Sequence, residues 1–222
     1  MSIRKAFFAL VYDGQMARAE EAGLRDLRRH LLADASGEVL EIGAGTGANL
    51  DLYGPGVVSL TVTEPEPAMV RRLDRHVRER APRATVLRAP AEDLPFEDDS
   101  FDVVVSTLVL CGVGDQPRAL REIGRVLRPG GRLLFLEHVR STDPKVARLQ
   151  DRCNWLNRLV VCCECNRPTL DSIRSAGFEV GSVEHGTLPK APPFVRPLIH
   201  GTARRPRAAG AGTPDLRTAA GS

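Results

Sequence analysis

The stretch Val39-Leu40-Glu41-Ile42-Gly43-Ala44-Gly45-Thr46-Gly47 decides the fold of this chain. A short apolar run contains an acid near its end, and three glycines follow at alternate positions. This pattern predicts a buried β-strand that turns tightly into a helix, with no side chains between the backbone of the turn and a ligand. We therefore expect an α/β domain with a nucleotide-type site at its first crossover.

The length and composition fit a single domain. The chain has 222 residues, of which 42% are apolar, and this suffices for one sizeable core. Residues 1–203 are expected to form that domain, with residues 1–36 as an N-terminal helical lid and residues 141–168 as an insertion that covers the substrate. Residues 204–222 are rich in Ala, Gly and Pro, which predicts a disordered tail.

The charge and the cysteine content restrict the partners and the compartment. The net charge of +3 is small and comes from arginines scattered among similar numbers of acids, so we expect no nucleic-acid partner. No apolar run approaches the roughly 20 residues that cross a bilayer, and residues 2–12 lack the features of a secretory signal. Five cysteines, an odd number, argue against a secreted disulfide framework. A cytoplasmic protein with reduced thiols is expected, and the sequence leaves its oligomeric state open.

Strands and helices are predicted to alternate along the chain. Amphipathic spacing predicts helices at residues 16–32, 69–80, 117–127 and 169–176. Apolar and β-branched runs predict strands at residues 39–42, 57–63, 85–87, 101–106, 132–137, 178–184 and 197–203. Pro129-Gly130-Gly131 is expected to end the helix at residues 117–127, and residues 138–168 are expected to be less regular. This order predicts an α/β, Rossmann-like and mostly parallel sheet of about seven strands, with helices on both faces and a C-terminal antiparallel hairpin.

In such sheets, ligands bind outside the carboxyl ends of the strands, near the point where the strand order reverses. Glu64 lies at the end of the second strand, about 20 residues beyond Gly43, where an acid can accept both ribose hydroxyls of an adenosine. The G-x-G-x-G spacing, with Ala48 at the next position, does not exclude NAD, so an NAD-type oxidoreductase is an alternative at this point.

Five motifs resemble those of the class I S-adenosylmethionine-dependent methyltransferases, in particular their type-eleven small-molecule group. They are Glu41–Gly47, Glu64, Ala91-Glu92-Asp93-Leu94-Pro95-Phe96, Phe101–Ser106 and Arg125-Val126-Leu127-Arg128-Pro129-Gly130-Gly131. The resemblance spans residues 38–140 and implies a seven-stranded sheet, with S-adenosylmethionine as methyl donor and S-adenosylhomocysteine as product.

The same resemblance implies the cofactor contacts, position by position. Glu41 would lie beneath the cofactor, and Gly43, Ala44, Gly45 and Gly47 would lie along its methionine and ribose. Glu64 would bind the ribose hydroxyls, and Ala91 and Glu92 would contact the adenine. Ser106 and Thr107 would lie beside the sulfonium.

Three further segments are similar to the mammalian methyltransferase-like seven thiol S-methyltransferases and their bacterial relatives. They are Thr107–Cys111, Leu136–Val139 and Val195–Gly201. This chain has Cys162-Cys163-Glu164-Cys165 before Asn166-Arg167, where the bacterial relatives usually have Gly-Gly-Cys. The resemblance implies methyl transfer to a small, fairly apolar acceptor, with a thiol as the first expectation. O- or N-methylation of a secondary metabolite or lipid head group is an alternative, as is a non-catalytic cofactor-binding module.

The expected reaction needs few catalytic groups. A sulfonium methyl is already activated, so the protein must mainly hold the acceptor in line, while a base can help a thiol to lose its proton. His138 is the predicted base, and Glu137 is a competing base or the acid that orients it. The predicted acceptor-side residues are Tyr12, Cys111, Trp155 and Cys165. No metal is expected, because the adjacent Cys162-Cys163 pair lacks the C-x-x-C spacing of a structural zinc site.

Overall fold

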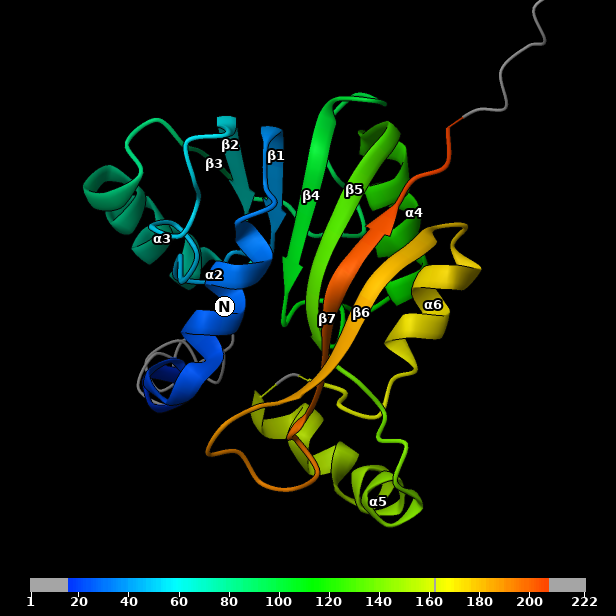
Figure 1. Ribbon diagram of the computed structural model, residues 1–222. Helices are drawn as coiled ribbons and strands as arrows, with labels where there is room; N and C mark the ends of the chain where they lie inside the picture. Colours follow the sequence, from blue (N-terminus) through cyan, green and yellow to red (C-terminus); the bar gives the residue numbers. More distant parts are fainter. Residues whose placement is uncertain (1–15, 162, 208–222) are drawn as a thin grey trace, which may run out of the picture.

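The computed structural model describes residues 16–161 and 163–207, whose strands form one seven-stranded sheet (Figure 1). The strand order is β3-β2-β1-β4-β5-β7-β6. The strands are β1 (Gly37–Ile42), β2 (Val57–Thr63), β3 (Thr85–Leu87), β4 (Phe101–Thr107), β5 (Leu127–His138), β6 (Glu179–Thr187) and β7 (Pro197–Arg204). The strands β1 to β5 pair in parallel, whereas β7 is antiparallel to both β5 and β6. The predicted sheet and its C-terminal hairpin are confirmed.

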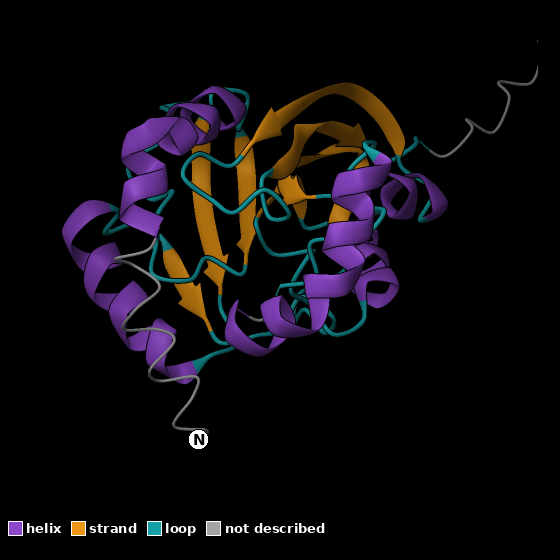
Figure 2. Cartoon of the chain, turned by 90° about the horizontal axis from the view of Figure 1, so that it is seen from below, coloured by secondary structure: helices purple, strands orange, loops and turns teal. Residues whose placement is uncertain are grey.

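Helices cover both faces of this sheet (Figures 1 and 2). They are η1 (Glu20–Leu24), α2 (Arg25–Leu32), α3 (Pro67–Arg80), α4 (Gln116–Val126), α5 (Pro144–Val161) and α6 (Thr169–Ser175). Successive residues of β4 point to opposite faces, so Val104 packs into the core that α4 and α6 share, and Val105 into the core with α2 and α3. The order reverses between β1 and β4, which places the ligand-binding edge at the carboxyl ends of these two strands.

Two helices differ from the sequence prediction. Residues 16–32 are helical, but the π-helical turn η1 interrupts them at Gly23, whose φ of 123° lies outside the helical region. No regular helix follows the glycine turn after β1; residues 45–52 form consecutive turns instead. The positive φ angles of Gly45 and Gly47, 60° and 91°, explain why a right-handed helix cannot begin there.

The region after β5 is more regular than predicted. Residues 144–161 form the 18-residue helix α5, where the sequence predicts irregular structure. β5 also begins five residues early, at Leu127, and its register against β4 shifts before Arg132. Gly130, with φ of 82°, allows this bulge. Helix α4 ends before Pro129-Gly130-Gly131, as predicted, but the segment itself lies within a strand.

The ordered chain continues past the predicted start of the tail. β7 ends at Arg204, and the Arg205 backbone N–H donates to the Gly131 carbonyl at 2.9 Å. The Arg205 guanidinium pairs with Asp99 and donates to the Leu127 carbonyl. These contacts hold the chain against the β5 bulge. Arg205 is therefore ordered, although the sequence predicts a disordered tail from residue 204 onward.

Candidate active site

The glycine turn that follows β1 is the first element of the site. Gly43, Gly45 and Gly47 have φ angles of 57°, 60° and 91°, which only glycine adopts without strain. A Cβ on Gly43 would lie 2.7 Å from the side chain of Val109, so this turn packs closely against the loop after β4. A Cβ on Gly45 would meet nothing within 4 Å, which leaves the backbone of the turn open on that side.

Glu64 lies beside this turn, directly after β2. Its carboxylate is buried and accepts hydrogen bonds from the backbone N–H groups of Gly45, at 3.0 Å, and Glu66, at 2.9 Å. The Ala44 N–H donates to the Thr63 carbonyl at 2.8 Å, which joins the turn to the end of β2. The structure therefore brings the predicted ribose-binding acid to the predicted turn.

A buried polar network lies beneath the turn, at the end of β1. The Glu41 carboxylate is 2% exposed and accepts hydrogen bonds from Asn49 Nδ2, at 2.9 Å, and the Tyr53 hydroxyl, at 2.7 Å. Burial raises the pKa of Glu41, and the hydrogen bonds from Tyr53 and Asn49 partly oppose this. Asn49 Nδ2 also donates to Thr107 Oγ1 at 3.0 Å, so the network joins the ends of β1 and β4.

Arg28, which was not predicted from the sequence as a site residue, supplies the positive charge of this network. Its side chain is buried and donates to Thr107 Oγ1 at 2.7 Å, to Asn49 Oδ1 at 3.1 Å and to Glu20 Oε1 at 2.9 Å. A signal was present, because Arg28 lies four residues after Leu24 and three before Leu31, on the apolar stripe of its helix. A charged residue on such a stripe is expected to have buried partners.

Glu137 holds the loop that follows β4. Its fully buried carboxylate accepts hydrogen bonds from the Ser106 hydroxyl at 2.6 Å and from the backbone N–H groups of Val109 and Cys111 at 3.1 and 3.3 Å. Burial raises the pKa of Glu137, and these donors partly offset the increase. Because its oxygens point at this loop, Glu137 acts in this structure as a positioning residue.

His138, the next residue of β5, is also buried, and because successive strand residues alternate it lies on the opposite face of the sheet from Glu137. Its Nδ1 atom has no hydrogen-bond partner within the described part of the chain. Burial lowers the pKa of the imidazole to about 4, although the backbone carbonyls of Pro197 and Val195 partly oppose this. The ring is therefore neutral at pH 7, with one buried nitrogen that is not engaged.

Three thiols cluster at the same edge of the sheet. Cys111, Cys163 and Cys165 are buried together, and Phe194 packs against them. A thiol hydrogen bond with Cys163 and burial raise the pKa of Cys111 well above its ordinary value, and burial raises that of Cys165 to about 12. The backbone N–H of His138 lies within hydrogen-bonding reach of the Cys111 sulfur. Cys111 and Cys165 are consequently protonated at neutral pH.

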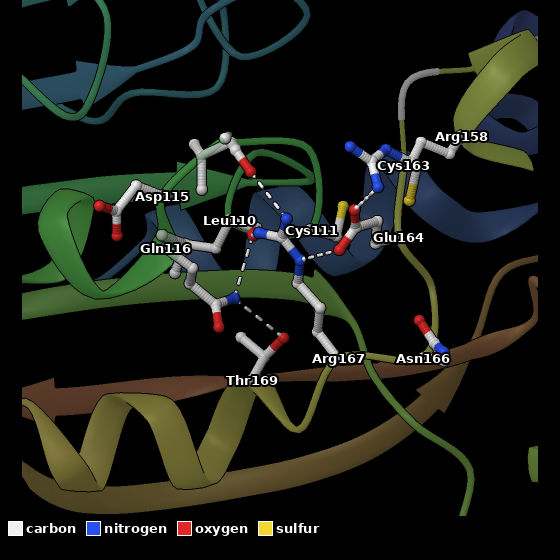
Figure 3. Close-up of polar contacts among 12 residues, drawn as sticks. Leu110, Cys111, Asp115, Gln116, Arg158, Cys163, Glu164, Asn166, Arg167 and Thr169 are labelled. Carbon is white, nitrogen blue, oxygen red and sulfur yellow. Dashed lines mark hydrogen bonds and ion pairs between the residues drawn. The ribbon is translucent and has the colours of Figure 1, made fainter. Parts of the chain in front are cut away.

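Arg167 fastens the segment that contains these cysteines to the loop after β4 (Figure 3). Its guanidinium donates to the carbonyls of Leu110, at 3.0 Å, and Val113, at 2.8 Å, and to the Glu164 carboxylate at 2.8 Å. Glu164 also pairs with Arg158 of α5 at 3.3 Å. The segment thus forms a fixed wall beside the end of β4.

The remaining predicted residues lie in different surroundings. Ala91 is buried, and Glu92 accepts backbone hydrogen bonds from the loop before α4, at 2.8 Å from Gly114. Trp155 is 68% exposed and does not belong to the buried thiol cluster. Tyr12 lies outside the described residues.

These residues suit S-adenosylmethionine by their chemistry. The ligand combines a ribose with two hydroxyl donors, a carboxylate and an ammonium group, and the edge offers Glu64, the Arg28 guanidinium and the Glu41 carboxylate for them. The open backbone at Gly45 permits close approach of the ligand. We conclude that the site and fold are those of a class I methyltransferase.

Comparison with known proteins agrees with this class. A family model described as a methyltransferase domain matches residues 40–135. The human thiol S-methyltransferase TMT1A is 33% identical over 211 residues, which are 88% of this chain and 82% of that protein. Human TMT1B is 45% identical over 180 residues, or 78% of this chain and 73% of that protein. The chain belongs to the S-adenosylmethionine-dependent methyltransferase family that includes these enzymes, and S-adenosylmethionine is its methyl donor.

Solved structures share the fold. The [4+2]-cyclase SpnF superposes with a TM-score of 0.67 at 23% identity, covering 83% of this chain and 80% of that chain. YcgJ of Bacillus subtilis has a TM-score of 0.67 at 19% identity, covering 85% of this chain and all of that chain. Among the described residues, no helix has the length and apolar content needed to span a bilayer.

Proposed function

We propose that this methyltransferase transfers the methyl group to the sulfur of a small, fairly apolar thiol. The observation that carries the proposal is the likeness to two human thiol S-methyltransferases over most of the chain. The buried thiols and Phe194 at the end of β4 support it, since they provide an apolar wall that suits such an acceptor and disfavours a charged polymer.

On the donor side, each charged group of the edge has a role in our proposal. Glu64 accepts the ribose hydroxyls, and the backbone at Gly43, Ala44, Gly45 and Gly47 lies along the methionine and ribose. Arg28 pairs with the carboxylate of the methionine portion, while Glu41 lies beneath it and attracts the ammonium group. Ala91 and Glu92 border the adenine, and Ser106 and Thr107 border the sulfonium. When bound, S-adenosylmethionine supplies an activated methyl group.

On the acceptor side, His138 is the proposed base. Its neutral imidazole has a buried Nδ1 atom without a hydrogen-bond partner among the described residues, and this atom would accept the proton that the acceptor thiol loses when it is methylated. Glu137 contributes by fixing the loop after β4, and Cys111 and Cys165 contact the acceptor. Their raised pKa values keep these two sulfurs protonated, so they do not compete with the acceptor for the methyl group.

Activity with a labelled methyl donor tests the acceptor. We expect methylation of small apolar thiols at higher kcat/KM than of phenols and amines of matched size. A His138→Gln variant should show a lower kcat at unchanged cofactor affinity, whereas the control His185→Gln, at an exposed site on β6, should match the original enzyme. Preferential O- or N-methylation would overturn the thiol assignment. Cofactor binding without methylation of any of these acceptors would favour a non-catalytic binding module.

Titration calorimetry with S-adenosylhomocysteine tests the donor side. Glu64→Ala should weaken binding by about 1–3 kcal/mol, because the ribose loses charge-assisted hydrogen bonds. Glu179→Ala, which removes an exposed carboxylate from β6, serves as the control. Equal affinities of the two variants would exclude Glu64 as the ribose-binding residue.

The proposed organisation assigns the remaining segments to this reaction. Residues 1–203 form one domain, in which residues 1–36 cover the cofactor, with Tyr12 shielding the sulfonium, and residues 141–168 cover the acceptor. The reduced thiols and the small-molecule acceptor agree with a cytoplasmic enzyme that has no nucleic-acid partner. Limited proteolysis with and without S-adenosylhomocysteine tests the lid, since ligand should protect residues 1–36 from cleavage.

A further inference from the structure

Helix α5 presents polar side chains to the protein. Gln150 is fully buried, and its side-chain amide nitrogen, Nε2, donates to the carbonyls of Val139, at 3.0 Å, and Cys165, at 2.8 Å. Asn157 Nδ2 donates to the Cys163 carbonyl at 2.9 Å. The inner face of α5 is therefore held by hydrogen bonds to loop carbonyls rather than by apolar packing.

The outer face of α5 carries the apolar side chains. These apolar side chains recur at spacings of three, four and seven residues, which places them on one face of the helix. The exposed members, with their exposed fractions, are Leu149 (37%), Trp155 (68%), Leu156 (44%) and Leu159 (51%). They are four of the five large apolar residues that are exposed in the described part of the chain. Figure 1 shows α5 beyond the carboxyl ends of β4 and β5, apart from the helices that cover the sheet.

The charges on this outer face are mainly basic. Lys145, Arg148 and Arg152 lie on it and are exposed, and none of them forms an ion pair with an acid among the residues that the structure describes. Asp151 is bound by Arg140 at 2.6 Å, which neutralises the only acid within α5. The face thus combines an uncompensated positive charge near its start with an apolar patch near its end.

We propose that the outer face of α5 docks on the surface of an anionic lipid bilayer. An interfacial helix characteristically has Lys and Arg beside Trp and Leu, because the cations meet lipid phosphates while the apolar side chains enter the boundary of the acyl chains. A second protein chain would satisfy the apolar patch but would need its own acids opposite Lys145, Arg148 and Arg152. Bilayer phosphates provide these anions without any specific partner.

The location of the docking face connects it to the active site. The inner face of the same helix binds carbonyls of Val139, Cys163 and Cys165, which border the end of β5 and the thiol cluster. Docking would place the acceptor side of the enzyme against a bilayer, where apolar thiols accumulate. This last step rests on the proposed function, whereas the docking itself does not.

Trp155 is the only tryptophan of the chain and reports directly on this face. The full chain is mixed with vesicles of phosphatidylcholine and phosphatidylglycerol, or of phosphatidylcholine alone. With the anionic vesicles we expect a blue shift of the Trp155 emission, protection from acrylamide and quenching by brominated lipid. High salt should weaken all three effects, since the attraction is electrostatic.

Matched variants distinguish vesicle binding through the outer face of α5 from binding through the overall positive charge of the protein. Replacing Lys145, Arg148 and Arg152 by Gln should lower the vesicle partition coefficient on the order of 100-fold, because each cation near an anionic surface contributes separately. The control replaces Arg71, Arg75 and Arg78, three exposed cations of α3, by Gln and should bind nearly as well. Leu156→Ser should lower binding about 10-fold while the cations remain.

Three results would overturn the proposal. The first is vesicle binding with unchanged Trp155 emission, which would assign the contact to another part of the chain. The second is equal loss of binding in the α5 and α3 triple variants. The third is an emission shift that follows protein concentration without vesicles, which would show a second copy on this face. The assay contains neither methyl donor nor acceptor, so its failure leaves the proposed reaction to its own tests.

Discussion

The pH dependence of stability follows from the burial of His138. The native imidazole has a pKa of about 4, against 6.5 for the free side chain. Between these values the unfolded chain binds a proton that the native protein does not, so the free energy of unfolding rises with pH across this window. Above pH 6.5 both states are neutral at His138, and this contribution no longer changes.

The size of the effect follows from the two pKa values. Lowering the pH from 7 to about 4.5 should cost about 2.5 kcal/mol through His138 alone, since one pKa unit corresponds to about 1.4 kcal/mol. Because His138 is only 6% exposed, solvent screens little of this contribution to the free energy of unfolding. Glu41 and Glu137, whose pKa values are raised, oppose this loss of stability in acid, whereas Asp51, Asp102, Glu122 and Asp151, whose pKa values are lowered, add to it.

A comparison with His138→Gln isolates the contribution of this residue. Urea unfolding followed by circular dichroism gives the free energy of unfolding of both proteins at each pH. Because the carboxylates are common to both, the difference between the proteins should change by about 2.5 kcal/mol across the window, with the variant losing less stability in acid. The exposed His185→Gln serves as the control. Parallel pH curves for the original protein and His138→Gln would refute a buried neutral imidazole.

Three other substitutions test the site. Gly43→Ala should destabilise the turn by about 1–2 kcal/mol, because alanine is strained at φ of 57° and its Cβ would meet Val109, and calorimetry should show weaker cofactor binding. Glu137→Gln should lower the melting temperature, since it presents an amide to backbone donors and costs about 1–3 kcal/mol; an unchanged melting temperature would contradict its anchoring role. Arg28→Met should cost about 3 kcal/mol in urea unfolding by leaving the Glu20 carboxylate and the Asn49 side-chain oxygen without the donor that Arg28 provides, while Arg28→Lys should recover part of the loss.

The sheet was predictable because its signals are local. β4 is a nearly continuous apolar run and β1 ends in a glycine turn, so each strand is specified by its own residues. The place of Glu64 beside the glycine turn could be predicted for a similar reason, since it directly follows β2. The C-terminal hairpin followed from two strands without a helix between them.

The rest depends on contacts between distant segments. Helix α5 was missed because its inner face is polar and its apolar residues point outward, which inverts the pattern by which helices are recognised. Arg28 meets Thr107 across 79 positions of sequence, and no local pattern gives that contact. The engagement of the Glu137 carboxylate by Ser106, Val109 and Cys111 likewise became visible only in three dimensions.

The hydrogen bonds from the loop after β4 to Glu137 affect how the substrate range of related enzymes can change during evolution. Two of its three bonds reach main-chain amides, which every residue except proline provides, so the shape of the loop is largely insulated from the identity of its side chains. Leu110 is fully buried in the core and has to stay apolar, but the partly buried residues of this loop, such as Val109 and Val113, can therefore be varied while the scaffold is retained. Leu108 is the exception, because its φ of 62° favours glycine or asparagine. A mutant library confined to this loop would be a direct route to new acceptors.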